Sequence, residues 1–330
     1  MRMFLVAIGL MLAMGAPLSA GDVDEHSVAA DAKWLVEVNL DAARESTIGK
    51  AFRAAVLKND KAKQRLEAAG KAMGLNLAKD IHGLLLYDRR FVHERGVAII
   101  RADADIERLT AFVEKLPDYK KTDVNGRPFH TFTHKKHNRP GHPVTVCLHD
   151  KGIVMGRDAS DVATAVKVLD GKSPSLMSVN SPLGRMNTSR EASPPGTILH
   201  VRAVGLDEQT VPFKSPIVRQ SKSFVMEAGE SDGKAFARAS LTADSSEVAQ
   251  QIKAVVEGYI AVAKLQCGDN EEAKKMFRAA KVSVDDDVVT VHWKGPAERL
   301  LRIIEKQVKR HAGSEHGKKH GSRANSNERK

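Results

Sequence analysis

The amino-acid sequence predicts an α+β fold in which two similar units of mainly antiparallel sheet are packed with helices. Two observations carry this prediction. The order of first strand, strand pair, helix, hairpin and final helix occurs twice, starting once at Lys33–Leu40 and again at Thr197–Ala203. No series of strand–helix–strand units with glycine-rich turns is present, which argues against a doubly wound nucleotide-binding fold. One irregular α+β domain is the alternative.

The first 20 residues have the layout of a secretory signal peptide. Arg2 supplies a short basic region, residues 3–14 form an almost unbroken apolar run, and Ser19-Ala20 suits a signal peptidase. The run is shorter than the roughly 20 apolar residues of a bilayer-spanning helix. We therefore expect residues 1–20 to be a cleaved signal and the protein to be exported, either to the periplasm or out of the cell.

The first unit is expected to span residues 21–170, with element boundaries given by the apolar spacing. Asp41 is expected to cap the helix after the first strand. Asn125-Gly126 is the strongest short hairpin signal in this unit. The expected elements are a strand over 33–40, helical segments over 42–57 and 60–73, strands over 81–87 and 96–101, a helix from 103–105 to Pro117, hairpins over 119–135 and 144–156, and a helix over 160–169.

A segment rich in proline and serine, residues 171–195, is expected to link the two units. The second unit is expected to span residues 196–310. Its expected elements are a strand over 197–203, a hairpin over 222–241, a helix over 246–265, a short helix ending near Phe277, a hairpin over 280–293 and a last helix after Pro296. The basic tail 311–330 has too few apolar residues to bury a core, so we expect it to be disordered.

Three segments of the chain give a resemblance to a known group of proteins. They are Asp-Ala-Lys-Trp-Leu-Val-Glu-Val-Asn-Leu-Asp at 31–41, Leu-Thr-Ala-Asp-Ser-Ser-Glu-Val-Ala-Gln-Gln-Ile at 241–252, and Ala-Lys-Val-Ser-Val-Asp-Asp-Asp-Val-Val-Thr-Val at 280–291. With the signal peptide, they resemble the uncharacterised exported α+β proteins of planctomycete-type bacteria. The resemblance implies the fold and export, and it implies no catalytic residues.

The composition is that of a globular protein with a basic surface. The chain is 42% hydrophobic and 28% charged, and its formal net charge is +11. An exported basic protein can meet anionic lipid headgroups or anionic polymers. Only 5% of the residues are aromatic, which argues against nucleic acid as the main partner. Cys147 and Cys267 are the two cysteines, and the sequence leaves open whether they form a disulfide.

Motifs of common enzyme classes are absent from the sequence. There is no Gly-x-Ser-x-Gly nucleophile turn. There is also no phosphate-binding Gly-x-x-x-x-Gly-Lys-Ser/Thr loop and no His-Glu-x-x-His zinc motif. We therefore expect a non-catalytic protein and predict no cofactor.

Metal-ligand side chains gather in one part of the first unit. The candidate ligands are His130, His134, His137, His142, Cys147 and His149. On a strand, His130 and His134 share one face, and Cys147 and His149 share a face of the next strand, because side chains alternate. Imidazole and thiolate bind zinc or copper, so a metal-dependent enzyme is the second hypothesis.

The loop between these strands also gathers cations. Lys135, Lys136 and Arg139 are candidate anion-binding residues at the hairpin tip. Three hypotheses follow. The favoured one is an exported non-catalytic envelope protein that binds an unidentified ligand or envelope protein. The alternatives are a metal-dependent envelope enzyme using the cluster at 130–149, and a protein that binds anionic polymers or lipid surfaces.

Overall fold

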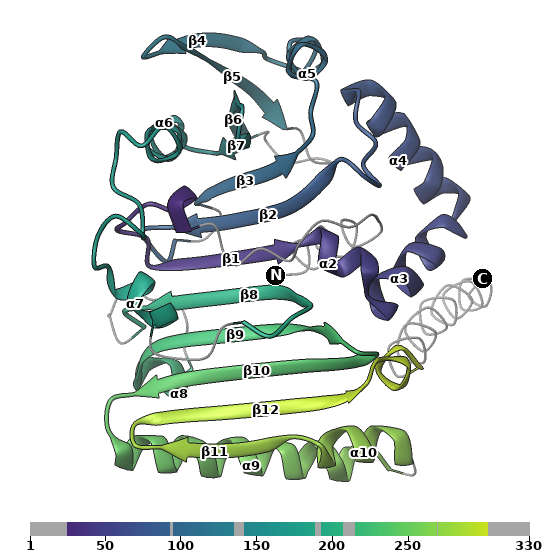
Figure 1. The fold of residues 1–330 in the computed structure, drawn as a ribbon, viewed down its shortest axis with the longest axis vertical. Coiled ribbons are helices and arrows are strands. Elements are labelled where there is room, and N and C mark those ends of the chain that lie inside the picture. The colour runs from purple at the N-terminus through teal and green to yellow at the C-terminus, as the bar shows by residue number, and fades with distance from the viewer. Residues whose placement is uncertain are drawn as a thin grey trace, which may run out of the picture.

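The fold was obtained as a computed structural model, which describes residues 25–92, 95–134, 142–188, 193–206, 215–268 and 270–302. The expected signal peptide and basic tail lie outside these ranges. In the described ranges, the strands form a single 12-stranded antiparallel sheet in the order β11-β12-β10-β9-β8-β1-β2-β3-β7-β6-β5-β4 (Figure 1). The α+β class and antiparallel pairing are therefore confirmed.

The strands follow one another along the chain largely as predicted. Their bounds are β1 Trp34–Asn39, β2 Ile81–Asp88, β3 Val97–Ala102, β4 Lys120–Val124, β5 Arg127–His134, β6 His142–His149, β7 Gly152–Gly156, β8 Thr197–Val204, β9 Ser221–Ser231, β10 Lys234–Ala243, β11 Lys281–Asp285 and β12 Val288–Pro296. The two halves of the chain meet where β1 pairs with β8 at the centre of the sheet.

Helices flank both faces of the sheet. Their bounds are η1 Glu25–Ser27, α2 Leu40–Glu45, α3 Thr47–Leu57, α4 Asp60–Met73, α5 Ile106–Val113, α6 Ala159–Leu169, α7 Pro182–Thr188, α8 Pro216–Arg219, α9 Ser246–Gln266 and α10 Glu271–Arg278. The expected helix over 42–57 is two helices, because the Ser46 hydroxyl caps α3 by accepting from the Gly49 N–H. Asn39, rather than the expected Asp41, caps α2.

Three clusters of buried apolar side chains hold these layers together. The largest packs the segment after η1, together with α6 and α7, against strands of the first half, and Leu35 and Leu85 belong to it. A second cluster around Val38 and Leu84 lies on the opposite face, since these residues alternate with Leu35 and Leu85 along paired β1 and β2. The third cluster packs α9 on β10 and β12.

The proline-rich connection is part of the core. Leu176 and Leu183, both within the expected linker 171–195, are buried in the largest cluster. Asn125-Gly126 makes the expected hairpin turn, with positive φ at both residues. The helix expected after Pro296 begins where β12 ends, and residues beyond 302 lie outside the described ranges.

Candidate functional site

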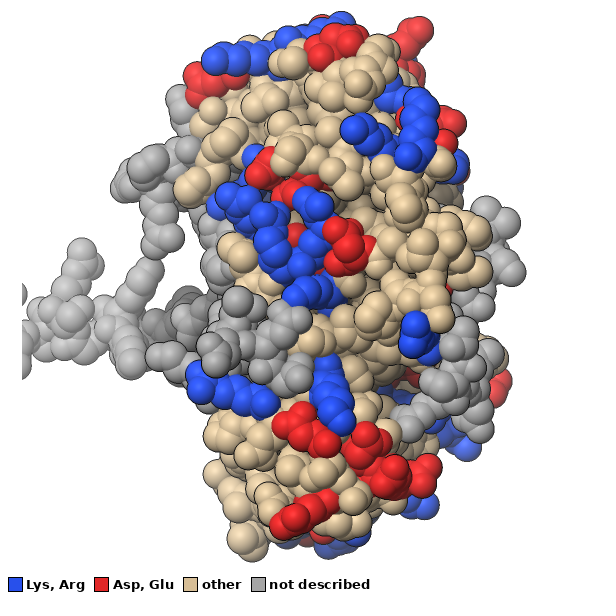
Figure 2. Space-filling model, turned by 90° about the vertical axis from the view of Figure 1, so that its left-hand side faces the viewer, with Lys and Arg blue, Asp and Glu red and all other residues tan. Residues whose placement is uncertain are grey.

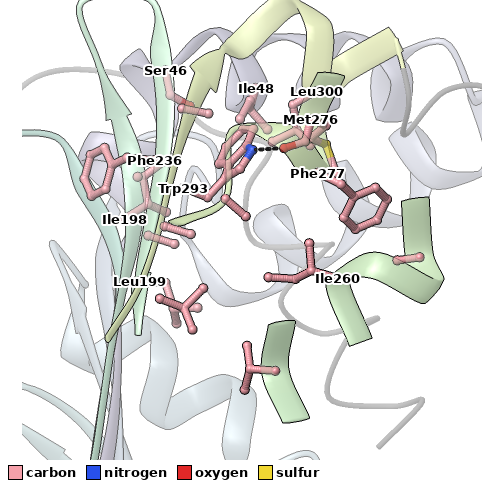
Figure 3. A pocket seen from close by; sticks show the side chains of 18 of the residues that line it. Ser46, Ile48, Ile198, Leu199, Phe236, Ile260, Met276, Phe277, Trp293 and Leu300 are labelled. Atoms are coloured by element: carbon pink, nitrogen blue, oxygen red, sulfur yellow. Dashed lines mark hydrogen bonds between the residues drawn. The ribbon is translucent and has the colours of Figure 1, made fainter. Parts of the chain in front are cut away.

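A cavity of about 690 Å³ opens between the sheet of the second half and helices α9 and α10 (Figure 3). Its walls come from α3, β8, β9, β10, β12, α9, α10 and the segment after β12. The lining residues are Ser46, Ile48, Gly49, Ile198, Leu199, Ala228, Gly229, Ala235, Phe236, Ala237, Val256, Tyr259, Ile260, Ala263, Met276, Phe277, Ala280, Val291, Trp293 and Leu300. We call this the apolar cavity.

The apolar cavity forms because only the first half of α9 lies on the sheet. Ala249 and Ile252 in that half are buried against the strands. Further along α9, Val256, Ile260 and Ala263 recur at helical spacing and are only half-buried, and all three line the cavity. The second half of α9 thus covers the apolar cavity on the side away from the sheet.

The polar groups of Ser46 and Trp293 in the wall are already paired. The Ser46 hydroxyl donates to the Ala43 carbonyl oxygen at 2.7 Å and accepts from the Gly49 N–H. The Trp293 indole N–H donates to the Met276 carbonyl oxygen at 2.9 Å, which joins β12 to α10 (Figure 3). Tyr259 is 68% exposed, as expected of a residue at the opening. A molecule inside therefore meets hydrocarbon rather than unpaired hydrogen-bonding groups.

The second half of the chain fixes the start of α3, which forms part of the cavity wall. The Glu230 carboxylate, at the end of β9, accepts from the N–H groups of Thr47 and Ile48 at 2.8 and 3.1 Å. These donors lie in the first turn of α3, where a helix has unpaired N–H groups and favours negative charge. The cavity wall is therefore built across the junction of the two halves.

The predicted metal ligands are distributed over two faces of the sheet. His130 pairs with Val146, while Cys147 pairs with Phe129, so His130 and Cys147 point to opposite faces. Cys147 is fully buried in the largest apolar cluster, and burial raises the pKa of its thiol to about 11. One metal ion cannot be shared by His130 and Cys147 in this arrangement.

His149 and His130 already have protein partners. The Lys151 N–H donates to His149 Nδ1 at 3.0 Å, and His149 Nε2 lies 3.1 Å from an oxygen of Asp170. The Tyr119 hydroxyl lies 3.0 Å from His130 Nδ1, and burial lowers the pKa of His130. Both ring nitrogens of His149 are thus engaged: Nδ1 holds the β6–β7 turn, and Nε2 joins β6 to Asp170 at the end of α6.

Two further predicted ligands, His134 and His142, are the last paired residues before the loop that connects β5 to β6. His134 and His142 occupy directly paired positions, and His142 is exposed. His137 and the candidate anion-binding residues Lys135, Lys136 and Arg139 lie outside the described residues. Within the described part of the chain, no group of three or more metal-ligand side chains has the arrangement of a metal site. The metal and anion sites at 130–149 stay predictions.

Both cysteines are free in this structure, Cys147 within the core and Cys267 at the end of α9. The Cys267 thiol donates to the Ala263 carbonyl oxygen at 3.1 Å. This is a local contact within α9, where Ala263 also lines the apolar cavity.

A histidine between two carboxylates was not predicted from the sequence. His82 Nδ1 lies 3.1 Å from an oxygen of Asp41, and His82 Nε2 lies 3.0 Å from Asp103. The buried Arg44 guanidinium donates both to Asp41 and to the Ile81 carbonyl oxygen. Burial lowers the pKa of His82, but the hydrogen bonds and charges of Asp103 and Asp41 together raise it above the ordinary value.

The His82 cluster gives stability a defined pH dependence. A raised histidine pKa contributes stability that is complete below the unfolded value of about 6.5 and is lost as pH rises through the folded value. We expect the free energy of unfolding to fall over this range, and we expect His82→Gln to remove this part of the fall. Urea unfolding at a series of pH values measures it.

The matched control is His142→Gln, because His142 is exposed. We expect this variant to keep the pH dependence of the unfolding free energy found in the wild type. Burial and the charge of Arg202 lower the pKa of His200 to about 4. Its effect on stability therefore falls at acid pH, and it is the same in the wild type and in both variants. Parallel profiles for the wild type and His82→Gln would contradict the assignment.

A charged surface lies after the end of β2 and at the start of α6. Arg89 and Arg90 each place a guanidinium nitrogen 2.8 Å from Asp161, and Arg95 lies 3.1 Å from Asp158. Figure 2 shows basic and acidic side chains interspersed on the visible part of this side of the molecule. These arginines are paired with acids, so they do not form a basic patch.

Comparison with protein-family models gives no match, and comparison with curated proteins gives none. Among solved structures, crystal form III of TP0453 has a TM-score of 0.49 at 9% identity, covering 87% of this chain and 100% of that chain. Crystal form I gives 0.43 at 10% identity over 87% and 98%, and form IV gives 0.45 at 9% over 84% and 95%. This similarity concerns the fold and transfers no ligand or activity.

None of the helices in the described ranges combines the length and the apolar character that crossing a membrane requires.

Proposed function

We propose that the protein is an exported, non-catalytic binding protein whose ligand is an apolar molecule held in the cavity between the sheet and α9–α10. The observation that carries this proposal is the wall of the cavity. The Ser46 hydroxyl and the Trp293 indole N–H are paired within the protein, the Tyr259 hydroxyl is at the opening, and the other lining side chains are hydrocarbon or thioether. Ligand pockets typically enclose about 300–1,000 Å³, and about 690 Å³ lies within that range.

The expected ligand is an aliphatic chain or an apolar ring system. Moving apolar surface from water into such a wall contributes about 0.8 kcal/mol for each buried CH₂ group. A polar group deep in the cavity loses its water without gaining a partner, which costs about 1–3 kcal/mol by mutational measures. The wall therefore selects molecules whose polar part stays at the opening, where Tyr259 is exposed.

The proposal includes two further claims, namely that the protein is exported and that it consists of two related units. The signal-like segment 1–20 supports export to the periplasm or beyond. Outward from the central pair, β1, β2 and β3 follow on one side and β8, β9 and β10 on the other. The hairpins β4–β5 and β11–β12 occupy the two outer edges. This order supports two related units, 21–170 and 196–310, with the β6–β7 hairpin added to the first.

Filling the apolar cavity tests the proposed function. The probe is N-phenyl-1-naphthylamine, an apolar dye whose fluorescence rises in a hydrocarbon environment. We expect the wild type to bind it and Ala263→Phe to weaken binding by roughly tenfold or more, because the new ring occupies the space beneath α9. Titration of dye fluorescence measures this, and circular dichroism checks folding.

Ala261→Phe is the matched control, since Ala261 is an exposed residue of the same helix. The control adds the same side chain outside the cavity, so we expect dye binding as in the wild type. Equal binding by both variants, or equal loss in both, would overturn the assignment of the apolar cavity as the binding site.

A further inference from the structure

We propose that a second cavity, between α3, α4, α5 and the loop after α4, binds a single-chain anionic amphiphile. The anionic group would lie on a basic rim and the chain on a leucine floor. The cavity has a volume of about 540 Å³ and is separate from the apolar cavity in its lining residues. The lining residues are Arg53, Leu57, Lys63, Leu66, Glu67, Gly70, Lys71, Gly74, Leu75, Asn76, Leu77, Ala78 and Arg108. We call it the basic-rimmed cavity.

The floor of the basic-rimmed cavity is apolar and only partly covered. Leu75 is buried, Leu66 and Leu77 are half-buried, and Leu57 is 44% exposed. Helices α3 and α4 lie at one end of the sheet (Figure 1). Each buries one residue, a glycine, so together they leave much of their apolar side open. An apolar surface left open beside charges is typical of a binding site.

The rim carries an excess of positive charge. Arg53, Lys63, Lys71 and Arg108 face a single acid, Glu67. Lys63 and Glu67 are 4.0 Å apart and both well exposed, which makes a weak pair. Within the described ranges, neither Arg53 nor Lys71 has an acidic partner at ion-pair distance. The rim can therefore accept an anion without first breaking a strong contact.

Arg108 is positioned by the end of α4. Gly74 caps α4 with a φ of 69°, and a Cβ placed there would come within 2.7 Å of Arg108 Cδ. The aliphatic part of Arg108 thus lies across Gly74, and its guanidinium reaches the rim from α5. Its pair with Asp105 spans 3.4 Å between two exposed side chains, so it contributes little and can exchange for a ligand.

One feature opposes anion binding, namely the carbonyl groups at the C-terminus of α4, which carry partial negative charge. The N–H groups of Gly74 and Leu75 both donate to the Gly70 carbonyl oxygen, which offsets part of that charge. Residues 47–73 contain seven lysines and arginines against Asp60 and Glu67. The full charges of the side chains outweigh the partial charges of the helix end.

Calorimetric titration with dodecyl phosphate, below its micelle concentration, tests the proposal. Dodecyl maltoside supplies the same chain with a neutral head, and inorganic phosphate supplies the anion alone. We expect dodecyl phosphate to bind the wild type at least tenfold more tightly than either comparison compound at this site. All titrations are repeated in Ala263→Phe protein, so that the apolar cavity does not contribute.

Two charge-matched double variants locate the site. We expect Lys71→Gln/Arg108→Gln to weaken dodecyl phosphate binding roughly tenfold or more, because both cations belong to the rim. We expect Lys50→Gln/Lys61→Gln to bind as the wild type, because these exposed lysines of α3 and α4 do not line the cavity. Circular dichroism confirms that both variants fold.

Equal weakening in the two double variants would overturn the assignment of the site, since it would show that the amphiphile is attracted to the overall basic charge of α3 and α4. Inorganic phosphate binding as tightly as dodecyl phosphate would overturn the amphiphile and leave a simple anion site. Dodecyl maltoside binding as tightly would overturn the role of the rim. None of these outcomes depends on dye binding in the apolar cavity, so the two proposals fail separately.

Discussion

Replacing Glu25 by Met is expected to lower the free energy of unfolding by about 3–5 kcal/mol, as when one partner of a buried ion pair is lost. Arg202 Nη1 lies 2.8 Å from Glu25 Oε1, and the two side chains are 1% and 7% exposed. Arg202 Nε and Nη2 have no hydrogen-bond partner among the described residues. Without Glu25, the guanidinium keeps its charge in a site that water does not reach. Urea unfolding followed by circular dichroism measures the change.

The double variant Glu25→Met/Arg202→Met separates the charge from the packing. With both charges gone, the apolar pair is expected to recover most of the stability that Glu25→Met loses, because similar-sized apolar residues often replace a buried ion pair at little cost. A double variant as unstable as the sum of the two single variants would contradict the coupling. The pair joins η1 to β8, so it holds the start of the described chain to the centre of the sheet.

Local patterns in the sequence predict most strands but not the way in which the two halves join. The alternation in Lys33–Leu40 and Thr197–Ala203 predicts both central strands, and Asn125-Gly126 predicts a hairpin. No pattern within either central strand predicts that β1 pairs with β8 and makes the sheet continuous. That pairing connects residues far apart in the chain, and both strands carry the same kind of side chains on each face.

The histidine cluster shows how strand register limits prediction from sequence. Alternation places His130 and His134 on one face of β5, and Cys147 and His149 on one face of β6, as predicted. Whether the two faces coincide depends on the register between the strands. The register pairs Phe129 with Cys147, which sends the two sets to opposite faces. A long loop between strands does not fix that register.

The apolar cavity had a signal in the sequence of α9. Between positions 254 and 265, Glu257 and Lys264 are the only charged residues, so this half of the helix is apolar on nearly all sides. Such a helix is normally covered on every side. The sequence does not reveal that this half of the helix stands away from the sheet, because its position depends on α10, which packs against α9 and is joined to β12 by the Trp293–Met276 hydrogen bond. The Asp41–His82–Asp103 cluster is hidden for a similar reason, since strand pairing rather than spacing brings it together.

Gly49→Ala is expected to destabilise the protein by about 3 kcal/mol or more, at the upper end of overpacking costs. A Cβ at Gly49 would overlap the carbonyl oxygen of Ala43, which is backbone and has little room to shift. In an open helix, alanine is better than glycine by about 1 kcal/mol, so the clash outweighs the helix preference. Because Gly49 lines the apolar cavity, the variant is also expected to weaken dye binding.

Gly258→Ala makes the same substitution where space is available. Gly258 lies in the exposed part of α9, and a Cβ there meets no atom within 4 Å. Helix preference then acts alone, and we expect stabilisation of up to about 1 kcal/mol. Thermal and urea unfolding of the two variants should therefore move in opposite directions. Loss of stability in both would mean that α9 needs the flexibility of glycine, whereas little change at Gly49 would mean that α3 can move away from α2. In that second case the wall of the apolar cavity is adjustable, and ligands larger than its present volume become candidates.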